Sequence, residues 1–416
     1  MNGREAVQSA SMTTDPRAQV EALCRRCVDV VTREDLVRRI ATGKPLKVKL
    51  GIDPSGPMLH LGHAVVLRQL RDFQDFGHEA ILVVGDFTAQ IGDPTGRLNA
   101  RKPRTREEID SDMRSYAQQA SAIIDIARTR VVYNSEWLSK LTLTDIMGLV
   151  AKTTVARMLE RDDFQKRYAE GSPIGLNEFL YPFAVAYDSV ALEADVELGG
   201  NEQLFNLLMG RRLQDDLGKP AQICMTLPIL EGTDGVQRMG KSLNNYIALG
   251  DEPNDMFGKV MSVPDGLLER YWKLATTASD EEIAQHLAAG PRDAKVALAA
   301  AIVTLYRGHE AARSAREHFE RTVVNKELPD EVRELTLAPG DARANVSKLL
   351  VLAGFAPSNR EAQRLVAQGA VKIDGVRVDD ARHTEPTWDG KVLQKGNHQF
   401  VRLTASRADR ADSADH

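Results

Sequence analysis

Short runs of apolar residues, bounded by glycine and proline, alternate with longer stretches of helical period between residues 47 and 249. LKVKLGID predicts a first strand, and AILVVGD predicts a second. Between them, apolar residues recur every three or four positions after Leu61 and stop at Gly77, which predicts a helix. This alternation is typical of a parallel sheet wrapped by helices. We therefore predict an α/β fold with a Rossmann-like domain over residues 1–249, which also holds an N-terminal helix starting at Asp15-Pro16 and a connective insertion.

The pattern becomes entirely helical from about Pro253 to Pro329, most clearly in DAKVALAAAIVTLYRGHEAARSAREHFERTVV. LAPGDARAN is then typical of a linker. The next segment, NVSKLLVLAGFAPSNREAQRLVAQGAVKIDGVRV, predicts two short helices, a strand and an Asp-Gly turn. We predict a helical domain over residues 250–335, a small domain over 345–403 and a disordered tail over 404–416.

Composition restricts the classes of function. A formal charge of −5 over 416 residues is unusual for a protein that holds nucleic acid over its whole surface, so any RNA contact must be local. No apolar stretch approaches the roughly 20 residues of a membrane span, and the first residues lack the apolar centre of a secretory signal. We predict a cytoplasmic protein without membrane contact. Cys24 and Cys27 have no second pair to complete a zinc site, so we predict no metal site in the protein itself.

Two basic motifs carry the candidate chemistry. His60 and His63 lie three residues apart where the loop after the first strand enters a helix, so their imidazoles and the backbone donors of the helix start can converge on an anion. Gly62 between them has no side chain, so an adenine ring or a phosphate can lie close to the backbone. Far downstream, RMGKS at residues 238–242 follows a loop rich in glycine and acid, and such a basic segment can close over a triphosphate.

Together, in this order, the motifs resemble the HIGH and KMSKS signatures of class I aminoacyl-tRNA synthetases. Four longer segments, KLGIDPSGPMLHLGH, GDFTAQIGDPTGR, TVARMLERDDF and YDSVALEADVELGG, resemble bacterial tyrosyl-tRNA synthetases, and this similarity runs nearly continuously from Lys44 onwards. Residues 345–403 are similar to the alpha-L RNA-binding module that ends many such enzymes. The resemblance implies that residues 250–335 bind the tRNA anticodon, and that the enzyme is a homodimer acting on tRNA, tyrosine and ATP with Mg²⁺.

The resemblance also implies roles for individual residues. It places His60, His63, Lys241, Arg238 and Ser55 on the ATP phosphates during reaction. It matches Arg97 and Arg101 to basic catalytic positions in the loop after GDP. Further ATP contacts are implied for Gly51, Asp53, Gly62, Gly200, Glu202, Gln203 and Met239. The amino acid is assigned to Asp93 and Tyr181 at its ammonium, to Asp188 at its phenolic hydroxyl, and to the neighbouring Val185 and Gln203. RNA contacts are implied for Lys348, Arg360, Arg364 and Lys372.

The sequence departs from the family's pattern around the ligands. Val185 replaces a glutamine that hydrogen-bonds the substrate ammonium, a loss of roughly 1.5–3 kcal/mol if nothing compensates. Glu202 stands where the family more often has an aspartate that touches the ribose, and Arg238 and Gly240 change KMSKS to RMGKS. These changes leave two interpretations open: neutral drift in a tyrosine–tRNA ligase, or a specialised paralogue that activates a modified tyrosine or a tyrosine analogue.

Two functions of other classes also remain. A small-molecule nucleotidyltransferase shares the two-histidine motif and the adenylate chemistry, but it does not need the C-terminal module. A non-catalytic RNA-binding protein derived from a synthetase would keep the basic residues of that module while its catalytic groups decayed. Here both histidines and Lys241 are retained.

Overall fold

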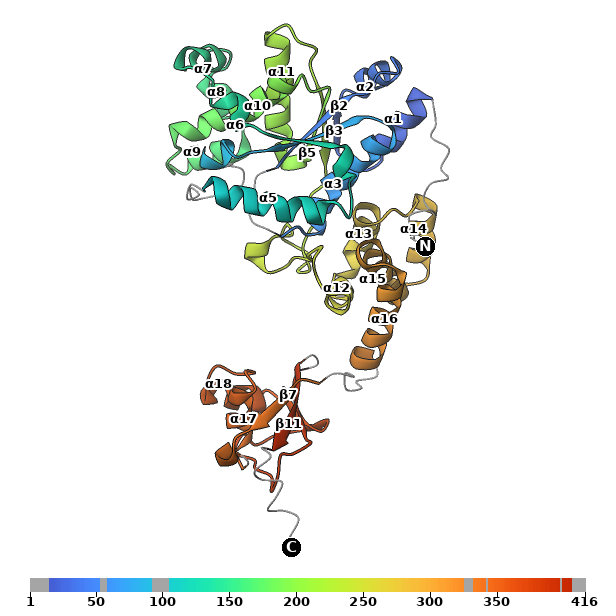
Figure 1. The fold of residues 1–416 in the computed structure, drawn as a ribbon, viewed down its shortest axis with the longest axis vertical. Helices are drawn as coiled ribbons and strands as arrows, with labels where there is room; N and C mark the ends of the chain where they lie inside the picture. The colour runs from blue at the N-terminus through green and yellow to red at the C-terminus, as the bar shows by residue number, and fades with distance from the viewer. Residues whose placement is uncertain are drawn as a thin grey trace. The chain divides into compact units, whose positions relative to one another are not determined.

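A computed structural model describes residues 15–52, 58–91, 105–324, 332–341, 343–396 and 399–405. The chain forms two compact units, Met1–Ala312 and Arg313–His416. Figure 1 shows a sheet flanked by helices in the first unit, and a small sheet beside helices α17 and α18 in the second.

The described part of the first unit is built on a six-stranded sheet with the order β1-β6-β5-β2-β3-β4. β1 is antiparallel to β6, and the other neighbours run parallel. The carboxyl ends of the parallel strands therefore meet at one edge, which is where open α/β sheets bind ligands. This topology confirms the predicted α/β fold class. The strands are β1 (Asp29–Val31), β2 (Lys47–Ile52), β3 (Glu79–Val84), β4 (Thr129–Tyr133), β5 (Val196–Gly200) and β6 (Ile223–Leu227).

Helices cover both faces of this sheet. The N-terminal helix α1 begins as predicted, because the Asp15 carboxylate accepts from the amides of Arg17 and Ala18 and proline occupies the first turn. The helix after the first strand, α3, ends before Gly77, whose φ of +86° suits glycine. The bounds are α1 (Pro16–Cys24), α2 (Arg33–Ile40), α3 (Leu61–Asp75), α4 (Thr88–Ile91), α5 (Arg106–Ala120), α6 (Ser135–Leu138), α7 (Leu143–Val150), α8 (Val155–Met158), α9 (Asp162–Ala169), α10 (Leu176–Leu192) and α11 (Leu204–Asp216).

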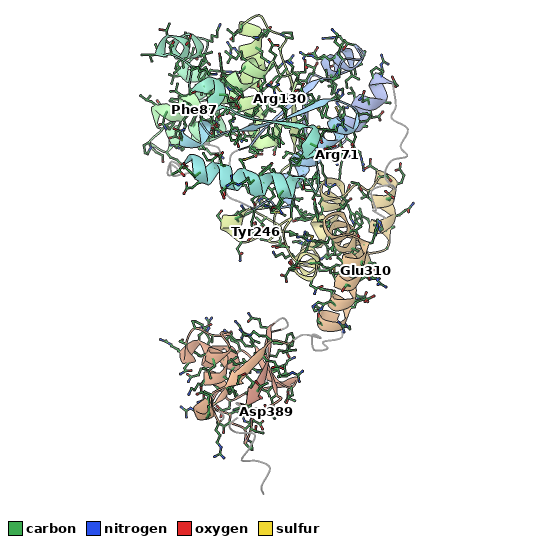
Figure 2. The ribbon with its side chains drawn as sticks, viewed as in Figure 1. Arg71, Phe87, Arg130, Tyr246, Glu310 and Asp389 are labelled. Carbon is green, nitrogen blue, oxygen red and sulfur yellow. The ribbon has the colours of Figure 1, made fainter. Side chains whose placement is uncertain are left out.

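The helices that follow residue 250 belong to the same compact unit as the sheet up to Ala312. The boundary that we predicted at residues 249 and 250 therefore does not separate two compact bodies. The physical reason lies in α13, which packs on α3 and whose Tyr271 hydroxyl donates to the Glu231 carbonyl at 2.7 Å. Lys259 lies 5.3 Å over the ring of Tyr246, which Figure 2 labels. These helices are α12 (Pro253–Met261), α13 (Leu268–Ala275), α14 (Asp280–Ala288) and α15 (Pro291–Arg307), and the next helix, α16 (His309–Phe319), crosses the boundary between the units at Ala312.

The second unit holds the two short helices, the strand and the Asp-Gly turn predicted for residues 345–403. Asp374 and Gly375 both have positive φ, as a tight hairpin turn requires. Trp388 is fully buried and donates to the Ala344 carbonyl at 2.9 Å, so it closes the small core. The elements are β7 (Glu334–Leu337), α17 (Val346–Leu352), α18 (Asn359–Ala367), β8 (Val371–Ile373), β9 (Val376–Arg377), β10 (Val392–Lys395) and β11 (Gln399–Ala405).

Two predicted boundaries are wrong in this unit. Glu334–Leu337, placed by us at the end of the helical domain and in the linker, forms strand β7, which pairs in parallel with β11. Thr404 and Ala405, placed by us in the tail, belong to β11 and pair with Thr336 and Leu337. A four-residue edge strand takes its stability from a partner far along the chain. The sequence around residues 334–337 and 404–405 therefore carries no local signal for a strand. The rest of the predicted tail lies outside the described residues.

Candidate active site

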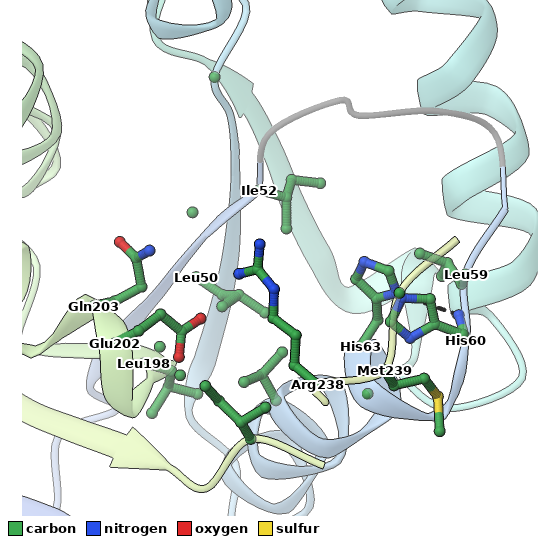
Figure 3. Close-up of a pocket in the computed structure, with 18 of the residues that line it drawn as sticks. Leu50, Ile52, Leu59, His60, His63, Leu198, Glu202, Gln203, Arg238 and Met239 are labelled. Atoms are coloured by element: carbon green, nitrogen blue, oxygen red, sulfur yellow. Dashed lines mark hydrogen bonds between the residues drawn. The ribbon is translucent and has the colours of Figure 1, made fainter. Parts of the chain in front are cut away.

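A cavity of about 950 Å³ opens at the carboxyl edge of the sheet in the first unit. Its walls come from β2, the start of α3, α10, the end of β5 and the segment 237–243. In Figure 3, Arg238 projects into the space between Glu202 and the imidazoles of His60 and His63. Thirteen predicted residues line this one cavity: Gly51, His60, Gly62, His63, Tyr181, Val185, Asp188, Gly200, Glu202, Gln203, Arg238, Met239 and Lys241. Asp53, Ser55, Asp93, Arg97 and Arg101 lie outside the described residues.

The two histidines form a fixed pair at the start of α3. His60 is the N-cap residue, and its backbone N–H donates to Nδ1 of His63 at 3.2 Å. The ring centroids are 3.9 Å apart. A Cβ at Gly62 would lie 3.0 Å from His60 Nδ1, so glycine makes room for this ring as well as for a ligand. Because Nδ1 of His63 accepts, its Nε2 is the protonated nitrogen of the neutral ring and can donate to a ligand.

Both imidazoles are held neutral. Burial lowers the pKa of His60 from 6.5 to about 2, with smaller contributions from His63 and the Lys241 charge. Burial, then the Lys241 charge, lowers the pKa of His63 to about 4. The pKa of Lys241 is itself lowered by burial, while Asp112 acts in the opposite direction. The site thus offers neutral hydrogen-bond donors beside a lysine, an arrangement that gains most when a multiply charged anion enters.

The depressed pKa values predict an acid-sensitive fold. Between about pH 6.5 and pH 4 the unfolded chain binds a proton at residue 63 that the folded chain does not, so stability falls as the pH falls through this window. We expect His63→Gln, which cannot titrate, to lose less thermal stability than the wild type between pH 7 and pH 4.5. Scanning calorimetry at several pH values measures this, with His309→Gln at an exposed histidine as control. Parallel curves for wild type and His63→Gln would contradict the assignment.

The segment 238–242 is anchored by a residue that the sequence did not single out. The buried Asn245 accepts from the Gly240 amide at 2.9 Å and donates to Asp234 at 2.7 Å and to the Arg238 carbonyl at 3.2 Å. This one side chain therefore fixes the backbone on both sides of Met239. Nothing in the sequence marks an asparagine in a loop for this role, because its partners become neighbours only in the folded loop.

The floor of the cavity is a buried carboxylate held by two donors. Asp188 on α10 accepts from the Trp137 indole at 2.8 Å and from the Asn134 side-chain amide at 3.3 Å. Asn134 is oriented in turn, because it donates to Thr88 and accepts from the Phe87 amide. Burial raises the pKa of Asp188 to about 7, opposed by Lys49 and by the two donors. Sequence reasoning found Asp188 but missed Asn134 and Trp137, which follow β4 and are 54 and 51 residues distant in the chain.

The predicted RNA-binding residues lie together in the second unit, on α17, α18 and β8. Lys348 pairs with Asp341, and Arg364 pairs with Glu361 at 2.6 Å. Arg360 is exposed, and Lys372 is half-buried. Two of the four cations thus have acidic neighbours within the unit. Their contact with RNA stays a prediction.

The described residues hold neither a candidate metal site nor a reactive cysteine pair. Within the described ranges, no three histidine, cysteine, aspartate or glutamate side chains are placed to hold a metal ion together. Cys24 and Cys27 are free, and burial raises the pKa of the Cys27 thiol to about 12.

No helix in the described ranges is both long and apolar enough to cross a membrane. The cytoplasmic location stays a prediction.

Known proteins share this fold and these motifs. The family model for class I tRNA synthetases (W and Y) matches residues 41–323, and the S4 domain model matches residues 346–384. The chain therefore belongs to the tryptophan and tyrosine branch of the class I tRNA synthetases.

Individual relatives are similar over nearly their whole length. A tyrosine–tRNA ligase of Thermotoga maritima is 48% identical over 395 residues, which is 94% of this chain and 98% of the relative. One from Moorella thermoacetica is 50% identical over 92% of this chain and 95% of its own length. The crystal structure of the tyrosyl-tRNA synthetase of Archaeoglobus fulgidus, complexed with L-tyrosine, matches at a TM-score of 0.59 and 26% identity over 73% of this chain and 99% of that chain.

Proposed function

We propose that this chain is a tyrosine–tRNA ligase, which joins tyrosine to ATP as tyrosyl-adenylate, releases pyrophosphate, and transfers the tyrosyl group to tRNA with release of AMP. One observation carries the proposal. The buried acceptor Asp188 lies in the same cavity as the imidazole pair and Lys241, so an amino-acid site and a phosphate site adjoin each other. The similarity to ligases of that name over more than nine-tenths of the chain supports the same conclusion.

The residues of the cavity suit attack of a carboxylate oxygen on the α-phosphate of ATP. This reaction needs positioning and charge neutralisation instead of a covalent nucleophile. We assign hydrogen bonds to the phosphates to His60 and His63, and charge neutralisation on the pyrophosphate side to Lys241 and Arg238. Gly51, Gly62, Gly200, Glu202, Gln203 and Met239 line the space for the nucleotide. Mg²⁺ would enter with the triphosphate, held mainly by phosphate oxygens, and would add to this neutralisation.

Helix α10 closes the end of the cavity that we assign to the amino acid. Tyr181, Val185 and Asp188 all line the cavity from this helix, one turn or so apart. An oriented carboxylate accepts a hydrogen bond from a phenolic hydroxyl, and it would be left short of a donor if phenylalanine bound instead. We assign Asp188 to the hydroxyl and Tyr181, with Asp93 and Gln203, to the ammonium end.

ATP–pyrophosphate exchange with the purified protein tests the function. The amino acids to compare are L-tyrosine, phenylalanine, β-tyrosine, and O-methyl-, 3-hydroxy- and 3-aminotyrosine, followed by charging of tRNA. We expect strong exchange with L-tyrosine. Exchange with none of them would favour the non-catalytic RNA-binding protein.

A second candidate rests on Val185, an apolar side chain on the wall where the family has glutamine. A paralogue that activates a tyrosine analogue would exchange weakly with tyrosine and strongly with one of the analogues. The same assay therefore decides between the two.

We also propose a homodimer. Large apolar side chains are exposed along α7 to α10, with Leu176 83% and Leu143 75% accessible, and with Met147, Val155 and Tyr168 among the others. A run of such side chains on one region of a chain is typical of a protein interface. One tRNA would then be shared between two subunits.

The dimer is testable by changing this surface. We expect Val155→Asp combined with Leu176→Asp to shift the protein from dimer to monomer in sedimentation velocity, because two charges would be buried without partners. Val376→Asp, at an equally exposed valine in the second unit, is the matched control. A wild-type protein that sediments as a monomer at micromolar concentration would rule the dimer out.

A further inference from the structure

One buried cation beside the cavity has no part in the chemistry described so far. Lys49 lies on the central strand β2, and its side chain is fully buried. Its ammonium makes three contacts: Glu197 at 2.8 Å, the Ser189 hydroxyl at 2.9 Å and the Val185 carbonyl at 3.1 Å. An ammonium has three donors, so all of them are used within the protein.

These contacts tie one turn of α10 to the sheet. Val185 and Ser189 are four residues apart on α10 and bracket Asp188, so the ammonium holds the turn that carries the carboxylate. Glu197 lies directly opposite Lys49 on the neighbouring strand β5. The second oxygen of Glu197 accepts from Ser189 at 3.0 Å and also from Gln222. These contacts hold Lys49, Ser189 and Glu197 together, and Val185, Asp188 and Glu197 border the cavity around this turn.

We propose that Lys49 is a specificity-determining positioning residue, which fixes the turn of α10 around Asp188 and maintains that carboxylate as an acceptor for the phenolic hydroxyl of the substrate. This inference rests on the proposed function. The electrostatics agree with the geometry, since the Lys49 charge lowers the pKa of Asp188 while burial and Glu197 raise it. Among the described residues, the charged groups acting on Asp188 are Lys49 from β2 and Glu197 from β5, and the neutral donors are Asn134 and Trp137.

The opposite signs of these two charges provide a sharp test. Protonated Asp188 has one acceptor oxygen fewer for the phenol, so tyrosine binding should weaken as the pH falls through its pKa of about 7. Removing the positive charge by Lys49→Met should move this midpoint to higher pH. Removing the negative charge by Glu197→Gln should move it to lower pH. An ion pair without electrostatic coupling to Asp188 would shift neither midpoint.

The experiment measures tyrosine and phenylalanine binding to the full-length protein by equilibrium dialysis from pH 5.5 to 9, without ATP. For Lys49→Met we expect the preference for tyrosine over phenylalanine to fall at least tenfold at pH 7, while the KM for ATP, measured separately by pyrophosphate exchange, stays unchanged. The double variant Lys49→Met/Glu197→Gln should return the midpoint towards the wild-type value. If Lys49→Met does not fold, the downward shift in Glu197→Gln decides alone.

Midpoints that move in the same direction in both single variants, or a preference unchanged in Lys49→Met, would overturn the inference. Failure of the proposed function looks different. A wild-type protein that binds neither amino acid, or an analogue only, would remove the phenol as the ligand of Asp188, and the role of Lys49 with it.

Discussion

Lys241→Met should lower the rate of adenylate formation by about 10²–10³-fold while leaving the affinity for tyrosine unchanged. Removing one preorganised group that stabilises transition-state charge costs about 2.7–4 kcal/mol in comparable sites. Lys241 fits this description, because it lies in the cavity and its charge reaches both imidazoles. Its partial burial lowers its pKa, so the ammonium is less well solvated before ATP binds and gains more from a phosphate.

The rate of pyrophosphate exchange at saturating tyrosine and ATP measures this effect, and tyrosine binding by dialysis measures affinity. The matched control is Lys219→Met, whose ammonium pairs with Glu193 at 2.8 Å and does not line the cavity. A rise in the KM for tyrosine with kcat unchanged would contradict this role, because it would place Lys241 in contact with the amino acid instead of the ATP phosphates.

The elements that could be predicted from the sequence are those whose signals are local. The strand at residues 47–52 and the helix after Leu61 carry strong periodicity, and Gly77 marks the helix end. The histidine pair and Lys241 were found because each lies in a compact motif, and the fold then brings them to one edge of the sheet. The residues that support the histidine pair, Lys241 and Asp188 carry no such local signal in the sequence. Asn134, Trp137 and Asn245 act through contacts made only in the folded chain, and none lies in a motif.

Lys49 shows how a local pattern can mislead. In LKVKLGI two lysines alternate with apolar residues, an arrangement that is also typical of a strand with one face towards water. The structure places Lys47 near the surface and Lys49 in the core. Helices cover both faces of this sheet, so a central position is buried whatever its side chain. The ammonium is tolerated there because Glu197 lies opposite it, 148 positions further along the chain.

Val185→Gln is the change that tests the deviation in the amino-acid pocket most directly. The Val185 side chain lines the cavity between Tyr181 and Asp188, and its carbonyl contact with Lys49 does not depend on the side chain. A glutamine at this position would reach further into the cavity and could accept from the substrate ammonium. A hydrogen bond to a charged group contributes about 1.5–3 kcal/mol, so we expect tyrosine to bind about ten- to a hundredfold more tightly.

Val185→Leu is the matched control, since it adds bulk at the same position without an acceptor. Dialysis with tyrosine, and exchange with tyrosine and the analogues, should show a gain for Val185→Gln that Val185→Leu lacks. The size of that gain is informative about the wild type. If Val185→Gln binds tyrosine no better than the wild type, another group already fills the hydrogen bond of the ammonium, and the valine is neutral drift. If the gain for tyrosine comes with a loss for an analogue, Val185 is the residue by which the pocket has been retuned.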